Sequence, residues 1–455
     1  MNFMNRDNEL RRLSALADSP EGGFAVVFGR RRVGKTRLLL EWCRRSGGVY
    51  VVGDQSSADL QRAYCAEAIA ARFPGFGDAV YPHWRSLFET LARAAKTEKW
   101  RGPLVIDELP YWVQSSPELP SVLQRFVDHQ ARAAGLVVAV SGSSQRMMQG
   151  IVLDGNAPLY GRAQALFEVK PLDIGYIDEL AGRRSARQTL DFYSAWGGVP
   201  RYWELAEKAG EVADAICALV LDPGGPLYDE PERLLLEEMP SIAEVRPVLD
   251  AIGGGAHRAS EIAARVGRPM TSLSRPLARL QELGLVARDI PFGESPRNAK
   301  KTLYRIADPF MRLWFRVVAP HRAELVSGSD DTRRELLARY WPQLVGQTWE
   351  ELCRARVSKL PESWKPAQRW WQGSAPEWDI VAEDPDGKRL LLGEAKVGAD
   401  VAKLAAEVAA RAAPVLPAKY AKHRVTRAVF VPEATRRTQI GDITVISLRD
   451  LAVRA

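Results

Sequence analysis

The most specific chemical pattern in the sequence is the glycine-rich loop GRRRVGKT at residues 29–36. It follows an apolar run from Phe24 to Phe28 and precedes TRLLLEW, which is typical of a helix start. In a GxxxxGK[ST] loop the glycines let backbone N–H groups face phosphate oxygens at a helix N-terminus. We therefore expect a P-loop that binds ATP and Mg²⁺, with Lys35 at the β/γ-phosphates and the Thr36 hydroxyl at the metal. The expected nucleotide-binding residues are Gly29, Arg30, Arg31, Arg32, Val33, Gly34, Lys35, Thr36 and Arg37.

A second carboxylate-bearing strand is needed beside a P-loop, and PLVIDELPYW at residues 103–112 has the right pattern. Its apolar run ends in Asp107 and Glu108. We expect Asp107 near Mg²⁺ and Glu108 to polarise the attacking water, a pair that suits hydrolysis. An acidic strand end without a catalytic role is the alternative. A further strand, GLVVAVSGSSQ, ends in polar residues, of which Ser141 is the candidate sensor of the γ-phosphate.

The N-terminal half resembles the archaeal-type ATPases of the AAA+/STAND group. The resemblance rests on FMNRDNEL, GRRRVGKTRL and VIDELPYW, and it extends through PLYGRAQALFEVKPLD, WGGVPRYWE and PLYDEPERLLLEE. It implies that Arg6, Asp7 and Glu9 lie near the adenine. It also implies a catalytic role for Arg162 at the γ-phosphate, in its own subunit or in a neighbour's, and hence a homo-oligomer. A surface arginine after a turn is the alternative for Arg162.

Residues 245–305 have the pattern of three short helices followed by two strands around a basic turn, as in a winged helix-turn-helix. From Ala256 to Arg305 there are ten basic and four acidic side chains, a net charge of +6, against +7 for the whole chain. Such a concentration favours duplex DNA of unspecified sequence as a partner. A winged helix used only for protein packing is the alternative. The candidate DNA contacts are Ser272, Ser274, Arg275, Arg279, Arg297, Lys300 and Lys301.

The C-terminal region contains a predicted hairpin, WDIVAEDPDGKRLLLGEAKVG, with Asp379 near its start and Glu394 and Lys396 at its end. Strand alternation puts Glu394 and Lys396 on one face. By themselves these residues are most economically explained as a polar edge of a half-buried hairpin. The surrounding order, a helix with Glu350, two or three strands, an alanine-rich helix and another strand, resembles the PD-(D/E)xK nuclease core.

That resemblance implies that Asp379, Glu394 and the Ala395 carbonyl coordinate Mg²⁺, with Glu350 as an additional acidic ligand. It implies that Lys396 orients the attacking water. Trp378 stands where the motif usually has proline. Archaeal-type ATPases often carry such a C-terminal domain of otherwise unassigned function.

The expected fold class is therefore α/β. The expected domains are a P-loop NTPase core with a parallel sheet (1–170), a helical lid (171–240), a winged helix (241–307), a linking helix (308–335) and a restriction-endonuclease-like α/β domain (336–455).

No apolar run approaches the ~18 residues of a membrane span, and the four cysteines show no metal or disulfide spacing. We thus expect a cytoplasmic protein without a membrane partner. Two functions stay open: an ATP-driven DNA-processing enzyme that cuts with Mg²⁺, and a non-cutting nucleotide switch.

Overall fold

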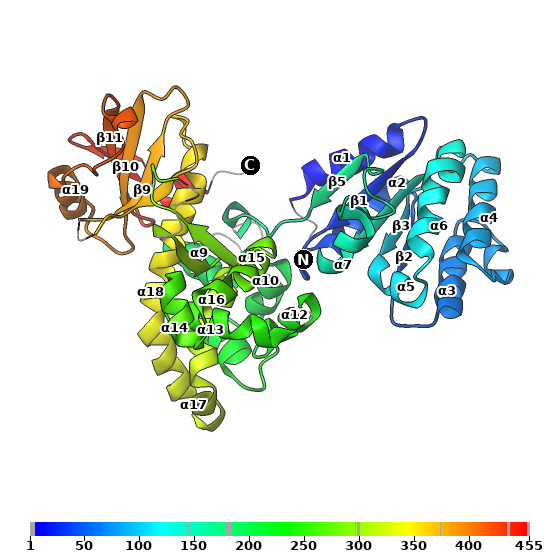
Figure 1. Cartoon of the computed structure of the whole chain (residues 1–455), viewed down its shortest axis with the longest axis horizontal. Coiled ribbons are helices and arrows are strands. Elements are labelled where there is room, and N and C mark those ends of the chain that lie inside the picture. The colour runs from blue at the N-terminus through cyan, green and yellow to red at the C-terminus, as the bar shows by residue number, and fades with distance from the viewer. Residues whose placement is uncertain are drawn as a thin grey trace. The chain divides into compact units, whose positions relative to one another are not determined.

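The computed structural model describes residues 5–143, 145–177, 184–239, 241–295, 297, 301–373, 375–434 and 437–452 (Figure 1). The chain forms two compact units. The first comprises residues 1–172 together with 199–201 and 237–239, and the second comprises the remainder. The boundary at Leu172 lies close to the predicted end of the P-loop core. The division into five domains stays a prediction.

The first unit is built on a five-stranded, wholly parallel sheet in the order β2-β3-β4-β1-β5. Its central strands are continuous apolar runs because both faces of the sheet are covered by helices. In this order β4 lies between β1, which precedes the P-loop, and β3, which ends in Asp107. The bounds are β1 Gly23–Phe28, β2 Val49–Val52, β3 Leu104–Asp107, β4 Val137–Gly142 and β5 Ala165–Glu168.

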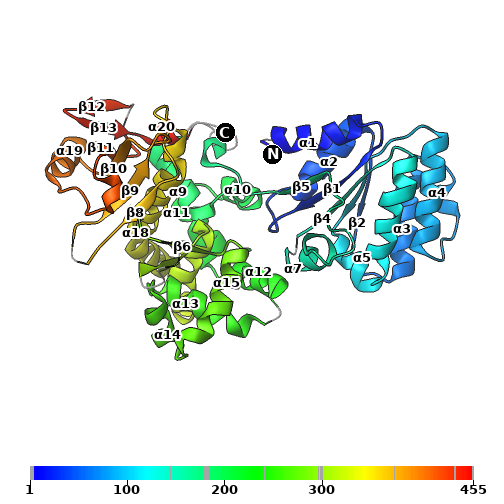
Figure 2. The same ribbon diagram turned by 45° about the horizontal axis from the view of Figure 1, so that its top comes forward.

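Two hydrophobic cores flank this sheet. Helices α1 (Asp7–Asp18) and α2 (Lys35–Ser46) contribute to one core, which includes Leu13, Leu38 and Trp42. The other core lies under a second group of helices, which are labelled in Figure 1 and of which Figure 2 shows α3, α4 and α5 from another side. These are α3 Ala58–Ala70, α4 Trp84–Thr97, α5 Leu109–Ser115 and α6 Leu119–Arg125; the further helical turns of the unit are η1 Phe76–Asp78, η2 Phe126–Ala131, α7 Gln145–Met148 and η3 Gln149–Leu153.

An aromatic column runs through the second of these cores. Trp112 stacks on Trp84 with ring centroids 4.3 Å apart, Trp84 on Phe88 at 5.8 Å, and Phe88 on Phe126 at 4.8 Å. All four side chains are buried. Offset stacking of this kind adds to the stabilisation from apolar burial, and it fixes α5, which begins directly after Glu108, against α4.

The second unit begins with a helical layer. Its longest helix, α18 (Asp330–Arg356), has 27 residues and is capped by the Ser329 side chain, which accepts a hydrogen bond from the N–H of Thr332. The residues expected as a linking helix (308–335) form several short elements and the start of α18. The bounds are η4 Ile174–Tyr176, α9 Ala186–Trp196, α10 Pro200–Glu207, α11 Val212–Ile216, η5 Cys217–Leu221, α12 Glu230–Glu238, η6 Ile242–Glu244, α16 Pro309–Leu313, η9 Trp314–Val318, η10 Ala319–His321 and α17 Arg322–Ser327.

Residues 246–306 form the helices and the antiparallel hairpin that the sequence predicts. The elements are α13 Arg246–Gly253, α14 Ala259–Val266, η7 Met270–Leu273, α15 Ser274–Glu282, β6 Val286–Asp289 and β7 Leu303–Ile306. The segment after β6 does not project freely. Phe292 is buried, its N–H donates to the Arg369 carbonyl at 2.8 Å, and its ring contacts Tyr420 at 5.0 Å. This hairpin is therefore docked onto the C-terminal sheet.

The C-terminal sheet has six strands in the order β12-β13-β11-β10-β9-β8. The hairpin of β9 and β10 is present as predicted, β10 pairs in parallel with β11, and the helix α19 connects these two strands. The expected order of helix, strands, helix and strand is thus found, while membership of a nuclease fold stays a prediction. The bounds are η11 Val357–Lys359, β8 Gln368–Trp370, β9 Trp378–Glu383, β10 Arg389–Ala395, α19 Val401–Ala410, η12 Ala418–Tyr420, β11 Arg424–Phe430, β12 Thr438–Ile440, β13 Ile443–Ile446 and α20 Leu448–Leu451.

Candidate nucleotide and C-terminal sites

The P-loop connects the end of β1 to the start of α2, as the sequence predicts. Gly29 and Gly34 have φ values of +143° and +97°, and a Cβ on Gly29 would lie 2.6 Å from the Val169 carbonyl oxygen. Only glycine therefore fits at the first position of the loop. The Lys35 ammonium folds back to donate hydrogen bonds to the carbonyls of Gly29 at 2.7 Å and Arg30 at 3.0 Å.

Lys35 is mostly buried and lies near several carboxylates. Burial lowers the pKa of its ammonium, and the negative charges of Glu108, Asp107 and Glu238 oppose that change. A nearby anion stabilises the charged form of a buried ammonium. Phosphate oxygens brought to this loop would supply that partner.

Asp107, at the end of β3, is 1% exposed and joins the P-loop through Thr36. The Thr36 hydroxyl donates to Asp107 Oδ2 at 2.8 Å, and the Tyr50 hydroxyl donates to the same oxygen at 2.7 Å. Burial, followed by the charge of Asp107, raises the pKa of Tyr50, which keeps the phenol protonated as a donor. Tyr50 was not among the predicted site residues, because no motif marks it.

Glu108 lies beside Asp107 in a left-handed backbone conformation, with φ at +54°. Its carboxylate accepts hydrogen bonds from Ser143, from the backbone N–H at 3.2 Å and from the hydroxyl. Ser141, in β4 beside the end of β1, is fully buried, and its hydroxyl has no hydrogen-bond partner among the described residues. The structure thus brings Lys35, Thr36, Asp107 and Glu108 together.

Arg6 and Arg162 lie in two different parts of the first unit, and the roles that the resemblance implies for them stay predictions. The buried Arg6 guanidinium donates to the carbonyls of Val33 at 3.0 Å and Lys170 at 2.7 Å, so it holds the backbone of the P-loop. Asp7 and Glu9 lie in the first turn of α1, and Glu9 pairs with Arg6 at 3.0 Å.

Arg162 pairs with Asp128 at 3.0 Å. It lines a polar pocket of about 460 Å³ with Gly23 and Phe24. These two residues begin β1, whereas the P-loop follows the end of β1. Arg162 is therefore not beside the P-loop of its own chain.

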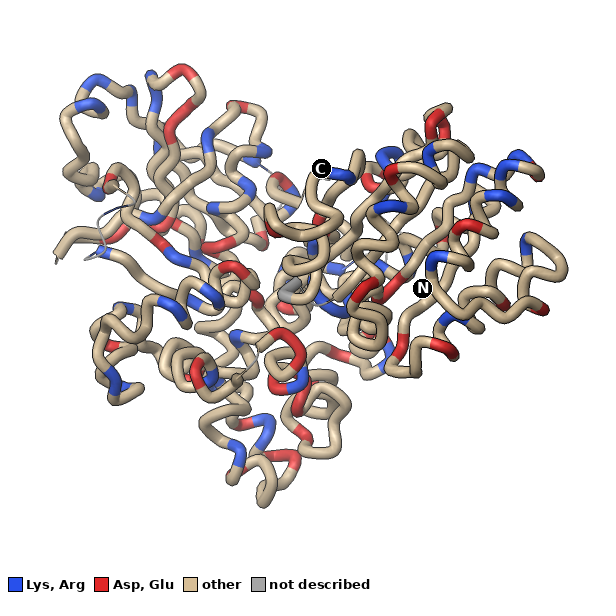
Figure 3. The backbone as a smooth tube through the Cα atoms, turned by 45° about the vertical axis from the view of Figure 1, so that its right-hand side comes forward, with Lys and Arg blue, Asp and Glu red and all other residues tan. Residues whose placement is uncertain are grey.

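The predicted DNA contacts differ in how accessible they are. Ser272, Ser274, Arg275 and Arg297 are exposed. Arg279 pairs with Glu282 at 3.2 Å, and Lys301 pairs with Glu294. Lys300 lies outside the described residues. Figure 3 shows basic and acidic residues interspersed along both units.

Asp379 and Glu394 lie on the paired strands β9 and β10, and Lys396 follows β10. The Lys396 ammonium is 2.9 Å from Glu394 Oε1 and 3.7 Å from Asp379 Oδ2. Arg411 donates to the other oxygen of Glu394 at 2.6 Å. Asp379 Oδ2 also accepts from the N–H of Ala395 at 3.1 Å. The three predicted residues are thus together, but basic side chains hold both oxygens of Glu394.

Glu350, on α18, lies 3.6 Å from Arg354. Burial and the charge of Asp379 raise the pKa of Glu350 to about 7. Burial, with the neighbouring Glu394, also raises the pKa of Asp379. Across the described part of the chain, no group of three or more His, Cys, Asp or Glu side chains is arranged to hold a metal ion. The predicted Mg²⁺ ligand set of Glu350, Asp379 and Glu394 therefore stays a prediction.

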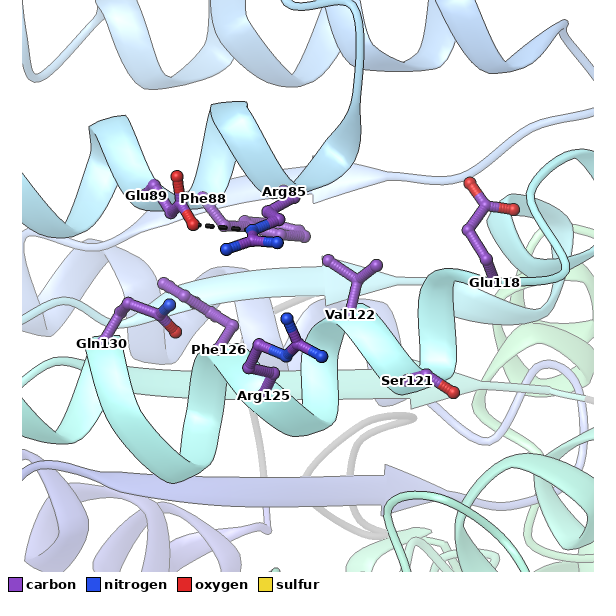
Figure 4. A pocket seen from close by; sticks show the side chains of 9 residues that line it. All are labelled: Arg85, Phe88, Glu89, Glu118, Ser121, Val122, Arg125, Phe126 and Gln130. Atoms are coloured by element: carbon purple, nitrogen blue, oxygen red, sulfur yellow. Dashed lines mark hydrogen bonds and ion pairs between the residues drawn. The ribbon is translucent and has the colours of Figure 1, made fainter.

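The first unit also has a pocket of about 260 Å³ between α4 and the helical segment of α6 and η2 (Figure 4). Arg85 and Glu89 form an ion pair of 2.8 Å at its rim. None of the lining residues belongs to the P-loop or to β3, so the pocket is separate from the nucleotide site. They are Arg85, Phe88, Glu89, Glu118, Ser121, Val122, Arg125, Phe126 and Gln130.

The parallel sheet, the glycine loop and the Thr36–Asp107–Glu108 arrangement together define a P-loop ATPase domain. Residues 3–204 match the model of a family described as an ATPase domain predominantly from Archaea. Residues 314–407 match a family described as archaeal and bacterial proteins of unknown function. Residues 3–204 are thus similar to archaeal ATPase domains, and residues 314–407 are similar to the second family.

Individual proteins are similar to larger parts of the chain. An uncharacterised protein of Methanocaldococcus jannaschii is 27% identical over 411 residues, which is 87% of each chain. The Walker-type ATPase of Pyrococcus abyssi superposes with a TM-score of 0.54 at 19% identity, over 69% of this chain and 96% of that one. The ORC2 protein of Aeropyrum pernix, solved with ADPNP and ADP, has a TM-score of 0.41 at 14% identity, over 76% and 94%. The Pyrococcus structure supports the fold, and the score of the Aeropyrum structure is too low to support an argument.

No helix in the ranges that the structure describes combines the length and the apolar character that crossing a membrane requires.

Proposed function

We propose that the protein is a Mg²⁺-dependent ATPase that couples nucleotide turnover to the binding of duplex DNA by its second unit. The observation that carries the ATPase part is the contact of 2.8 Å between Thr36 and Asp107, with Glu108 next in the chain and Lys35 one residue before. These four side chains come from the two segments that phosphate binding and water activation require.

The residues have distinct roles in this proposal. Thr36 and Asp107 would hold Mg²⁺, which neutralises charge on the β- and γ-phosphates. Lys35 exchanges the carbonyls of Gly29 and Arg30 for phosphate oxygens. Glu108 orients the attacking water once Ser143 releases its carboxylate, and the buried Ser141 hydroxyl is free to donate to the γ-phosphate.

ATP turnover by purified variants tests these roles. Lys35→Ala is expected to lower the rate at least about a hundredfold, since it removes a positioned charge at the phosphates. Arg44→Ala is the matched control, because Arg44 lies on the same helix with its side chain 72% exposed. Equal turnover by Lys35→Ala and Arg44→Ala would refute the assignment of the nucleotide site.

The proposal assigns DNA binding to the exposed face of α15 and the turn after β6. It is supported by the exposure of Ser272, Arg275 and Arg297 in a segment with a net charge of +6. Arg275→Ala is expected to weaken binding of a fluorescent duplex and to reduce its salt slope by about 1. Arg449→Ala, an exposed arginine on α20, is the control. No change in either quantity would exclude α15 from the DNA interface.

The position of Arg162 supports a homo-oligomer in which this arginine acts at the nucleotide of a neighbouring subunit. Mixing inactive Lys35→Ala with inactive Arg162→Ala tests the idea. A mixed assembly would contain interfaces with both residues intact, so ATPase activity is expected to reappear on mixing. An Arg162→Ala protein that retains full activity by itself would refute the role.

A second candidate function for the C-terminal domain is Mg²⁺-dependent DNA cleavage. It is favoured by the contact of Lys396 with both Asp379 and Glu394. The pairing of Glu394 with Arg411 instead favours a non-cutting nucleotide switch. Incubation with plasmid and Mg²⁺ or Mn²⁺, with and without ATP, separates them: cleavage that Asp379→Ala abolishes supports the nuclease, and intact plasmid under every condition supports the switch.

A further inference from the structure

An acidic side chain reaches the P-loop from a distant part of the sequence. Glu237 and Glu238 end α12, and residues 237–239 belong to the first unit. Glu237 Oε2 lies 2.7 Å from the Nε of Arg31. Arg31 belongs to the loop that is expected to receive the phosphates.

The electrostatic surroundings connect this acidic pair to the catalytic groups. Burial raises the pKa of Glu237, the positive charges of Arg31 and Arg32 lower it, and the negative charge of Glu108 raises it. The charge of Glu238 partly opposes the lowering of the Lys35 pKa that burial causes. Glu237 therefore pairs with a cation of the expected phosphate loop, and Glu238 follows it directly in the chain.

A nucleoside triphosphate brings several negative charges to these cations. Like charges near one site repel each other, and solvent partly screens the repulsion here because the side chains of Arg31 and Glu237 are 39% and 37% exposed. Glu237 and a phosphate group cannot both be fully paired with Arg31. This competition between carboxylate and phosphate rests on the proposed nucleotide site.

We propose that Glu237, with Glu238 next to it in the chain, forms an acidic plug that competes with the triphosphate for Arg31, and that ATP binding displaces residues 237–239. The residues on either side of this segment, 202–236 and those from 240 onward, belong to the second unit. Displacement of the plug therefore moves a segment that is covalently continuous with the second unit on both sides.

Nucleotide affinity tests the plug. The double variant Glu237→Gln/Glu238→Gln keeps the shape of both side chains and removes both charges. We expect it to bind ATP up to about tenfold more tightly than the wild type, as measured with a fluorescent ATP analogue, because two partly screened repulsive charges are lost. The gain for ADP should be smaller, and both gains should shrink with added salt.

Glu244→Gln is the matched control, since Glu244 is an exposed glutamate seven positions further along the chain than Glu237. It should leave the affinities for ATP and ADP unchanged. Melting temperatures of the variants establish that each is folded. Unchanged or weaker ATP binding by a folded double variant would refute the plug while leaving the ATPase proposal intact. If neither the wild type nor the double variant binds ATP, both proposals fail.

Amide hydrogen exchange gives a second readout that does not depend on mutation. The N–H groups of residues 237–239 should exchange faster when ATP is bound, because the segment leaves the loop. Exchange at Glu244 serves as the internal reference. Slower exchange at residues 237–239 on addition of ATP would contradict displacement.

Discussion

Replacing Tyr50 with phenylalanine removes one hydroxyl from the candidate nucleotide site. In the structure this hydroxyl donates to Asp107 Oδ2 at 2.7 Å, and Thr36 donates to the same oxygen. Asp107 is only 1% exposed, so water cannot easily replace the lost donor. A hydrogen bond to a charged group contributes about 1.5–3 kcal/mol. We expect Tyr50→Phe to lower the free energy of unfolding of the first unit by about that amount.

For a unit of this size the change corresponds to a decrease of about 3 to 12 °C in melting temperature. The assay is thermal unfolding without nucleotide, together with titration of Mg²⁺ against a fixed concentration of ADP. A less well oriented Asp107 should also weaken the Mg²⁺ dependence of ADP binding. Tyr64→Phe is the control, because Tyr64 is 47% exposed on α3. A loss of stability no larger than that of Tyr64→Phe would show that the hydroxyl does not stabilise Asp107.

Three further predictions follow from other contacts. Phe292→Ala should destabilise the second unit by about 3–5 kcal/mol in denaturant unfolding, because it opens a cavity in the C-terminal core, whereas Val326→Ala at an exposed site should change little. Arg6→Ala should raise the dissociation constant for ATP, since the carbonyls of Val33 and Lys170 lose their donor; equal affinity would contradict a role in holding the loop. The raised pKa of Glu350 means that its contribution to stability is full below pH 4.5 and is lost as the pH rises to about 7, so Glu350→Gln should flatten the melting temperature over that interval.

The sequence was sufficient to predict the P-loop and its partner strand, because both are local patterns with a topological consequence. The carboxyl ends of parallel strands meet at one edge of a sheet, so the ends of β1 and β3 had to lie near each other. The contact between Thr36 and Asp107 therefore follows from two separate motifs. The hairpin that carries Asp379, Glu394 and Lys396 was predictable in the same way, from alternation and a turn.

What could not be predicted depends on contacts between residues far apart in the chain. Nothing in the local sequence around Glu237 indicates that it reaches Arg31. Strand pattern alone does not identify Tyr50 as the donor to Asp107. The position of Arg162 near the start of β1 depends on the path of the segment before β5. The pairing of Glu394 with Arg411 depends on where α19 ends. Each of these contacts is set by tertiary packing, which overrides what a short motif suggests.

The burial of Phe292 also bears on how this architecture can be inherited. A segment whose aromatic side chain completes the core of another domain cannot be transferred by recombination without leaving a cavity in that core and exposing its own apolar residue. The hairpin that follows α15 and the C-terminal sheet should therefore have diverged together as one evolutionary module. Where a related chain lacks the C-terminal sheet, the position of Phe292 is expected to carry a polar residue.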